Sequence, residues 1–386
     1  MRKAPIKKVA RIETGTTPST KKPEYYGGEI PFVKPADLSY TPRIVQESEN
    51  YVTQLGFEQG RKIPKGGVMV CSIGATIGKV GIAGKDLITN QQINTAIFDE
   101  ATVLPKFGLY FFVSLGDKLA DKSSSTTVPI INKTNFSKLE IPIPILSEQK
   151  AIVAKLDRAQ RLIDIDREML AKYDELIQSV FLEMFGDPVT NSKGWEVKNL
   201  GDLTTKVGSG STPRGGSKVY QRHGIIFIRS QNVLMNKLDL VDVAYISDEI
   251  HEGMQNTWVQ ENDVLLNITG ASIGRVCVYN KSEAANVNQH VCILRPIQEK
   301  IKPYYLSHLI SSKKYQDKIL GQQTGGTRQA FNMTQIKNFD IPLPPLELQT
   351  KFNHMLTKLK GEVQNLKLNT KKSEELFSSL LQKFFN

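Results

Sequence analysis

The chain has few cysteines and no long hydrophobic run. Its 386 residues include only Cys71, Cys277 and Cys292, and none of these forms a Cys-x-x-Cys pair. This usage argues against a disulfide framework and against a zinc site. No stretch approaches 18 consecutive apolar residues, and the first residues lead into no apolar signal region. We therefore expect no membrane association and a cytoplasmic location.

Sequence signatures of catalysis are also absent. Gly74-x-x-x-Gly78-Lys79 is one residue shorter than a phosphate-binding loop, and Val80 stands where that loop needs Ser or Thr. No Gly-x-Gly-x-x-Gly run, His-x-x-x-His pair or Cys/His cluster occurs. Asn-Pro-Pro-aromatic and Asp-Pro-Pro-aromatic, the tetrapeptides of amino-methyltransferases, are missing as well. We expect no catalytic residue, no metal ligand and no cofactor in this chain.

The charge balance is basic. Fifty Lys and Arg residues against 39 Asp and Glu residues give a net charge of +11 and an isoelectric point near 9.3. A polyanion is therefore a plausible partner, although net charge alone is weak evidence for one.

Two long segments carry the hydrophobic spacing of a coiled coil. In residues 146–185 apolar positions recur in alternating steps of four and three, and the same phase returns 200 residues later in 346–384. Asp166 interrupts the first stripe, either as a polar seam residue that fixes the register or as an exposed position at its edge. Proline residues precede both segments, and Gly186 followed by Pro188 ends the first. The first stripe comprises Ile152, Leu156, Ala159, Ile163, Leu170, Tyr173, Ile177, Val180 and Met184, and the second comprises Phe352, Leu356, Leu359, Val363, Leu366, Thr370, Ser373, Phe377, Leu380 and Phe384.

Two blocks rich in Gly, Pro, Thr and short β-branched runs precede these helices, and they are diverged copies of one another. The Gly-x-Thr-Pro loop at 15–18 returns at 210–213, and the glycine turn at 74–79 returns at 270–275. Asn90-Gln91 likewise returns as Asn288-Gln289. The residues between these landmarks differ, which is typical of one scaffold carrying two different surfaces.

This order predicts an α+β fold in four parts. Two similar, mostly-β domains at 1–144 and 187–344 alternate with long helices at 145–186 and 345–386. The second block begins at the far end of the first helix, so we expect the helices to pack as an antiparallel coiled coil with a pseudo-two-fold relation. Each helix of about 40 residues is expected to be about 60 Å long.

Polar and basic residues recur at the turns of both blocks. Arg and Lys read guanine and Asn and Gln read adenine in the major groove, whereas Ser, Thr and Lys hold phosphates. Each such residue could equally occupy its turn for a structural reason, because its side chain bonds the local backbone. The recurrence of the whole set in both blocks of a basic chain favours DNA contact. The residues predicted to contact DNA are Thr17, Lys21, Lys22, Lys34, Lys79, Asn90 and Gln91 in the first block and Thr212, Arg214, Lys218, Arg229, Gln231, Asn232, Arg275, Asn288 and Gln289 in the second.

The doubled order of these motifs resembles the specificity subunit of Type I restriction-modification systems. The shared order is a Gly-x-Thr-Pro loop, a Phe-Val-Lys or Phe-Ile-Arg strand, a glycine turn, an Asn-Gln segment, Ile-Pro-x-Pro and a Glu-Gln or Leu-Gln helix start. It covers essentially the whole chain. Two departures occur: the first block lacks the opening Gly194-Trp195 of the second, and Leu348 stands where Glu148 precedes Gln149. The first leaves the start of the first block undefined, and the second is expected to weaken one of two docking contacts.

The resemblance implies two target-recognition domains that each read one half of a split, asymmetric double-stranded DNA site. It implies that the helices act as a spacer and as a docking surface for two modification subunits, which bind S-adenosylmethionine and methylate adenine. Restriction subunits would supply cleavage and translocation with ATP and Mg, and this chain would be no enzyme itself.

Two other classes of function stay open from the sequence. A coiled-coil interaction scaffold whose blocks bind protein would lack the steep loss of DNA binding with salt that phosphate contacts produce. A self-sufficient DNA-modifying enzyme would bind S-adenosylmethionine by itself.

Overall fold

The computed structural model describes residues 2–116, 119, 130–321 and 330–385, and they form two compact units. Unit one comprises Met1–Met169 and Leu366–Asn386, and unit two comprises Leu170–Asn365. Each unit contains one end of helix α5 (Leu146–Phe185) and the opposite end of helix α10 (Leu346–Phe385). The units therefore divide both helices between them. The predicted division into two blocks and two separate helices stays a prediction.

Both units are built on the same pair of four- or five-stranded sheets. In unit one the first sheet has the order β2-β10-β7-β8-β4, and in unit two the corresponding order is β13-β22-β19-β20. These strands are β2 (Ala10–Thr14), β10 (Ile93–Phe98), β7 (Val68–Cys71), β8 (Val80–Ala83), β4 (Ile44–Val45), β13 (Thr204–Ser209), β22 (Val291–Pro296), β19 (Val264–Asn267) and β20 (Val276–Val278).

The second sheet also recurs in the two units. Its order is β5-β3-β9-β6 in unit one and β17-β14-β21-β18 in unit two, and the central pair is parallel in both. These strands are β5 (Tyr51–Val52), β3 (Tyr26–Val33), β9 (Leu87–Thr89), β6 (Lys62–Ile63), β17 (Ala244–Ile246), β14 (Ile225–Ile228), β21 (Ala285–Val287) and β18 (Trp258–Val259).

Short elements complete each unit. A two-stranded ribbon leads into each long helix, β1–β11 in unit one and β12–β23 in unit two, and β15 pairs with β16 in unit two. The remaining elements are β1 (Lys3–Pro5), β11 (Glu140–Pro142), β12 (Glu196–Asn199), β23 (Asp340–Leu343), β15 (Val233–Leu234), β16 (Lys237–Leu238), α1 (Gln54–Gln59), α2 (Pro105–Leu115), α4 (Lys133–Ser137), α6 (Asp248–Glu252), α7 (Pro303–Ser311), α8 (Lys313–Gly321) and α9 (Met333–Lys337).

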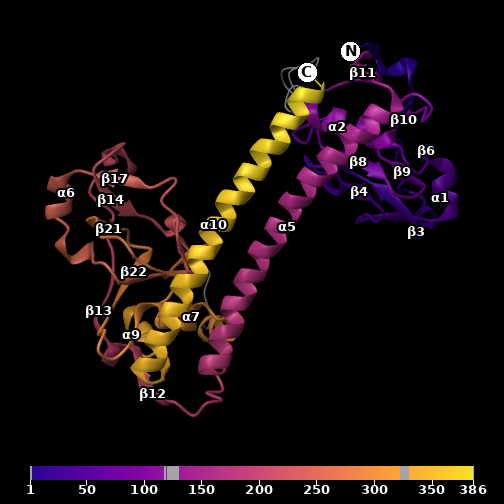
Figure 1. Cartoon of the computed structure of the whole chain (residues 1–386). Helices are drawn as coiled ribbons and strands as arrows, with labels where there is room; N and C mark the ends of the chain where they lie inside the picture. The colour runs from indigo at the N-terminus through magenta and orange to yellow at the C-terminus, as the bar shows by residue number, and fades with distance from the viewer. Residues whose placement is uncertain (1, 117–118, 120–129, 322–329, 386) are drawn as a thin grey trace. The chain divides into compact units, whose positions relative to one another are not determined.

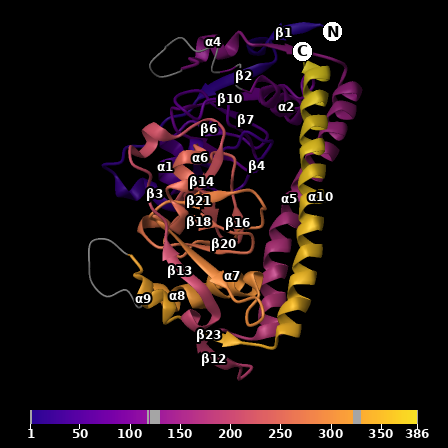
Figure 2. The same ribbon diagram turned by 90° about the vertical axis from the view of Figure 1, so that its left-hand side faces the viewer.

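Within each unit α5 and α10 lie side by side and run antiparallel (Figures 1 and 2). In unit one the Lys155 ammonium lies 5.9 Å from the Phe384 ring, and Arg167 pairs with Glu374 at 2.7 Å, so the partner number falls as the α5 number rises. In unit two Phe181 and Phe185 pack on Phe352 with ring centroids 5.5 and 5.4 Å apart. The predicted fold class, with two similar mostly-β domains and antiparallel long helices, is confirmed.

The seam differs from its prediction at the helix ends. Phe181, Phe185, Leu381 and Phe385 are buried, whereas the predicted seam residues Val180, Met184, Leu380 and Phe384 are only partly buried. At these ends the helices also pack on a third helix, α2 in unit one and α7 in unit two, which draws a second row of side chains inward. Asp166 is partly buried.

A buried glutamine fixes the start of each long helix. The Gln149 amide accepts a hydrogen bond from Leu104 N at 2.9 Å and donates to the carbonyls of Thr102 and Pro144. Gln349 accepts from Lys302 N at 2.8 Å and donates to Pro344 O. Both side chains are fully buried, so the Glu-Gln and Leu-Gln helix starts fasten the helices to their own units.

Candidate nucleic-acid interface

The Gly-x-Thr-Pro loop packs on the Asn-Gln turn in both units. Gly15 N donates to Ile93 O and Gly210 N donates to Val291 O, each at 3.0 Å. A Cβ at Gly15 would lie 2.2 Å from Asn90 O, so only glycine allows this approach. The same close approach occurs at Gly210, where a Cβ would lie 1.9 Å from Val287 O. Two motifs more than 70 residues apart in the sequence thus form one surface feature, which we call the loop pair.

The loop pair joins predicted site residues directly. The Thr17 hydroxyl donates to the Gln91 carbonyl oxygen at 2.7 Å, and Thr212 makes the same hydrogen bond with Gln289. All four side chains are exposed. Because each threonine occupies the oxygen of its glutamine, the amide N–H groups are the remaining donors. In unit two Gln289 Nε2 already lies 3.2 Å from His290 Nε2, which leaves one N–H of Gln289 for a ligand.

Asn90 and Asn288 are buried beneath the loop pair. The Asn90 side chain bonds both the backbone N–H and the side chain of Gln92, and Asn288 accepts from His290 N at 3.1 Å. These amides shape the turns that present Gln91 and Gln289. Their predicted contact with DNA stays a prediction.

A cation follows the same strand in each unit. Lys34 comes directly after β3 and Arg229 directly after β14. Lys34 Nζ donates to Asn50 Oδ1 at 2.9 Å, and the guanidinium of Arg229 donates to Asp242 O at 2.8 Å. The two strand-end cations therefore occupy equivalent places but have different partners.

The turn after each strand-end cation is fastened by a buried polar side chain. Asp37 accepts a hydrogen bond from Lys34 N at 2.8 Å, and Asn232 accepts one from Arg229 N at 2.9 Å. Asn232 also donates to the carbonyls of Asp239 and Asp242. Its amide is thus engaged within the protein, whereas Gln231 beside it is exposed.

The glycine turns present Lys79 and Arg275. Gly74 and Gly78 have φ values of 85° and 89°, and Gly270 and Gly274 have 70° and 84°, which favours glycine at all four positions. The Lys79 ammonium lies 5.8 Å from the Tyr40 ring, and Arg275 is partly buried. The remaining predicted residues, Lys21, Lys22, Arg214 and Lys218, are exposed in the segments that follow the Gly-x-Thr-Pro loops.

Three cations of unit one were not predicted. Arg11, Arg61 and Lys133 surround the Glu13 carboxylate at 2.7, 3.6 and 3.9 Å. The backbone N–H of Arg61 donates to Thr16 Oγ1 at 3.1 Å, so this cluster adjoins the loop pair. Three cations on one carboxylate leave an excess of positive charge. The alternation of Arg11 and Glu13 along β2 was visible in the sequence, but their contacts with Arg61 and Lys133 arise only in the fold.

Unit two places a buried ion pair near the corresponding sheet. Arg295 forms two hydrogen bonds of 2.8 Å with Asp263, whose side chain is 1% exposed. Burial, and next the charge of Arg295, lower the pKa of the adjacent Lys206. Arg295 lies opposite Lys206, at the end of β22 away from Val291, so this ion pair does not adjoin the loop pair of unit two.

Neither a metal-binding cluster nor a membrane-spanning helix occurs among the described residues. Within them, no group of three or more His, Cys, Asp or Glu side chains is placed to hold a metal ion. No helix among them combines the length and apolar character needed to cross a membrane.

Comparison with known proteins identifies the family. The description "Type I restriction modification DNA specificity domain" applies to residues 1–172 and 192–376. The MjaIX specificity subunit of a Type I restriction enzyme from Methanocaldococcus jannaschii is 26% identical over 384 residues, covering 93% of this chain and 87% of that protein.

Solved structures share the fold. A chain from a study of complex assembly and conformational transition of the type I R-M system matches with a TM-score of 0.64 and 19% identity, covering 99% of this chain and 97% of that one. The S subunit of a Type I restriction-modification system from M. genitalium matches with a TM-score of 0.53 and 16% identity, covering 100% and 96%. Together with the repeated loop pairs and antiparallel helices, these matches show that the chain belongs to the family of Type I restriction-modification specificity subunits.

Proposed function

We propose that this chain reads a bipartite, asymmetric double-stranded DNA site, with each unit reading one half. The observation that carries the proposal is the loop pair, which has the same exposed Thr–Gln hydrogen bond in both units. Beside it the charged residues differ, because the Glu13 cluster adjoins the loop pair of unit one, whereas Gly208 stands at the position of Glu13 in unit two. A repeated frame with different surroundings suits a protein that holds two similar backbones and reads two different sequences.

The shared residues are suited to hold phosphates. Both Gln91 and Gln289 keep at least one amide N–H as a hydrogen-bond donor, and a phosphate has only acceptors. The residues that differ, above all the strand-end cations Lys34 and Arg229, are suited to base edges. Arginine pairs with guanine through two hydrogen bonds, and lysine acts as a point charge.

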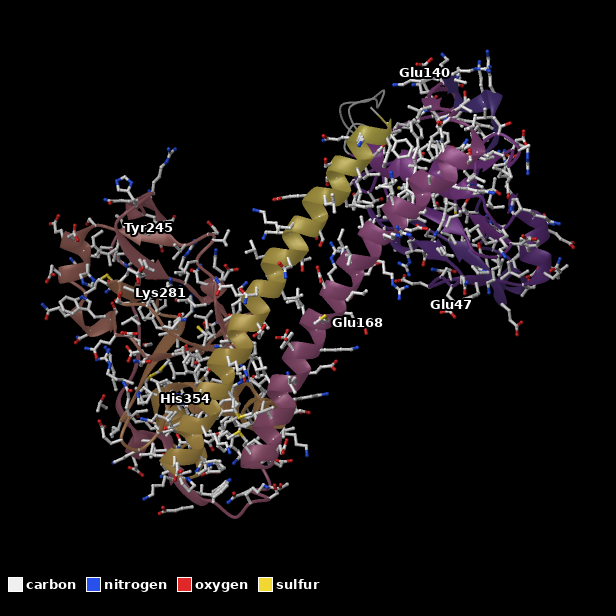
Figure 3. All side chains as sticks on the ribbon, in the orientation of Figure 1. Glu47, Glu140, Glu168, Tyr245, Lys281 and His354 are labelled. Carbon is white, nitrogen blue, oxygen red and sulfur yellow. The ribbon has the colours of Figure 1, made fainter. Side chains whose placement is uncertain are left out.

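The long helices are the proposed docking surface for modification and restriction subunits. Several large apolar side chains on α5 are 40–50% exposed, including Leu162, Ile165 and Met169 in unit one and Leu176 and Leu182 in unit two. Leu162, Ile165, Met169 and Leu176 follow one another at steps of three, four and seven, a spacing suited to a partner helix. Glu168, labelled in Figure 3, lies on the same helix.

Catalysis is proposed to reside in the partners. The modification subunits would bind S-adenosylmethionine and methylate adenine, and the restriction subunits would use ATP and Mg. This chain would supply sequence recognition and no reacting group.

Mapping methylated adenines tests the proposal. The chain is co-expressed with modification subunits of a Type I system from its own source, and the host genome is sequenced for methylated sites. We expect one two-part motif. Exchange of residues 1–144 for the matching block of a relative should change one half of the motif only. A change in both halves, or no methylated motif, contradicts the proposal.

The helices are further proposed to set the number of unread base pairs between the half-sites. Four residues inserted at matching places in α5 and α10 should change that gap while both half-sites stay the same. An unchanged gap would exclude this role of the helices.

The alternative is a coiled-coil scaffold without DNA specificity. Binding of the purified full chain to a duplex library should fall steeply between 50 and 200 mM salt if several phosphates are contacted, by roughly a thousandfold for six contacts. Binding without that dependence would favour the scaffold.

A further inference from the structure

The loop 239–242 of unit two touches three of the predicted reading residues, Arg229, Gln231 and Asn232. It leads into β17, whose Tyr245 is labelled in Figure 3. The Asp242 carboxylate accepts a hydrogen bond from Gln231 Nε2 at 2.9 Å and lies 3.7 Å from the guanidinium of Arg229. Its backbone carbonyl accepts from the same guanidinium at 2.8 Å. Asp242 thus contacts the side chains of both Arg229 and Gln231.

Arg229 is held from several sides. Its guanidinium lies 5.8 Å from the Tyr220 ring, and only 24% of its side chain is exposed. The nearby amide of Asn232 donates to the carbonyls of Asp239 and Asp242, which fixes the loop above the strand end. An arginine restrained in this way loses less rotamer freedom when it binds, because its side chain is already ordered.

Asp242 itself is open to solvent, with 87% of its side chain exposed. An exposed carboxylate beside DNA repels phosphate, so its presence weakens binding to any sequence. Its contacts with Arg229 and Gln231 instead increase sequence selectivity, because they hold the hydrogen-bond donors of both side chains in fixed orientations. Negative charge at this place therefore favours discrimination over affinity.

We propose that Asp242 is a positioning residue that sets the base preference of unit two by orienting Arg229 and Gln231. With one N–H of Gln231 committed to Asp242, the amide keeps an oxygen and one N–H, the acceptor and donor that adenine requires. The guanidinium of Arg229 keeps further N–H groups for the two acceptors of guanine. This inference rests on the proposed function.

In unit one a neutral side chain orients the strand-end cation. There Lys34 is oriented by the neutral amide of Asn50, and its ammonium lies 5.2 Å from the Phe32 ring. The role proposed for Asp242 therefore belongs to unit two, and the half-site of unit one provides an internal reference in every measurement.

The test uses the full chain with its modification subunits and a library of duplexes randomised at the recognised positions. Bound duplexes are sequenced, and affinity for a single unrelated duplex is measured separately. The variants are Asp242→Ala, which removes both contacts of the carboxylate but leaves the hydrogen bond from Arg229 to the backbone carbonyl, and Asp242→Asn, which keeps an acceptor for Gln231 but removes the charge. Asp239→Ala is the matched control. Its carboxylate lies 3.8 Å from Lys237 and accepts a 3.3 Å hydrogen bond from Val241 N, so this variant removes a negative charge and a contact within the same loop while the Asp242 carboxylate stays.

We expect Asp242→Ala to reduce the preference for the correct base in one half-site by about tenfold. This is about the discrimination that one good bidentate contact provides. Affinity for the unrelated duplex should stay equal or rise, and Asp242→Asn should lie between Asp242→Ala and the wild type. The control should keep both half-sites. A uniform loss of affinity with unchanged preference would indicate a structural role and overturn the inference, as would unchanged binding.

Failure of the proposed function gives a different result. In that case the wild-type complex itself selects no motif from the library. If the wild type selects a two-part motif and Asp242→Ala selects the same one, only the inference about Asp242 fails.

Discussion

The two units hold their long helices with different chemistry at equivalent positions. In unit one the Tyr110 hydroxyl of α2 donates to Asp157 of α5 at 2.6 Å, and Lys106 pairs with the same carboxylate at 2.7 Å. In unit two the place of Tyr110, five residues into the short helix, is taken by His308 of α7, which is buried against Phe352 with ring centroids 5.3 Å apart. No hydrogen bond satisfies His308 Nε2.

The charges at this contact differ as well. Lys360 of α10 lies 4.4 Å from the Tyr304 ring, and burial lowers its pKa to about 8. Burial also lowers the pKa of His308 to about 3, and the charge of Lys360 contributes to that shift. A polar network and an aromatic cluster thus support the same helix arrangement, so the fold requires matching volume and placement here more than matching chemistry.

The strongest test of this comparison truncates the aromatic side chain at the end of each long helix to alanine. Phe385→Ala should destabilise unit one, because Phe385 packs on Phe107 with centroids 5.0 Å apart, and Phe185→Ala should destabilise unit two, where Phe185 packs on Tyr305 at 4.7 Å. Each truncation should cost about 3–5 kcal/mol. Hydrogen exchange measured by mass spectrometry should show the loss of protection in one unit only. Equal loss in both units would contradict independent cores.

The buried glutamines give the next largest effect. Gln149→Ala leaves three backbone groups without partners and Gln349→Ala leaves two, so we expect losses of about 1–3 kcal/mol, larger for Gln149. Hydrogen exchange of the first turns of α5 and α10 measures each loss. Exposed Glu148→Ala is the control and should have little effect.

Acidification should destabilise unit two more than unit one. The pKa of His308 is about 3 in the folded chain and near 6.5 when unfolded, so unit two loses stability as the pH falls from about 6.5 toward 3. The expected slope is about 1 kcal/mol per pH unit. His308→Phe should flatten this dependence in unit two, as followed by hydrogen exchange at pH 7 and pH 5. A slope that persists in the variant would assign the effect to other groups.

The smallest effect is expected from the ion pair of unit one. Arg167 and Glu374 join α5 to α10, but their side chains are 51% and 46% exposed. Glu374→Gln should therefore cost about 0.2–1 kcal/mol, and added salt should remove the difference. Thermal unfolding at low and high salt provides the measurement. A cost that resists salt would show that this pair is more than a surface contact.

The fold was largely predictable because the sequence shows local hydrophobic periodicity and an internal repeat. The stripes from Ile152 and Phe352 predicted the helices, and the recurring motifs predicted two similar units. The ends of the seam were mispredicted because the burial of Phe185 and Phe385 depends on α2 and α7, which no heptad pattern of the long helices reveals.

The candidate site was less predictable. Turn composition marked Thr17 and Gln91 separately, but only the fold shows that they bond each other. Composition also could not distinguish the buried amide of Asn232 from the exposed one of Gln231. The cations Arg61 and Lys133 were missed because their common partner, Glu13, lies far from both in sequence.

The division of each long helix between the units has a consequence for synthesis on the ribosome. The hydrophobic core of unit one includes Ile152 and Leu156 of α5 together with Phe377, Leu381 and Phe385 of α10. Those last side chains emerge from the ribosome about 280 residues after β10, the last strand of the sheets of unit one. Unit one must therefore wait, with part of its apolar surface open, until the end of α10 has been made, by which time every residue of unit two has been synthesised.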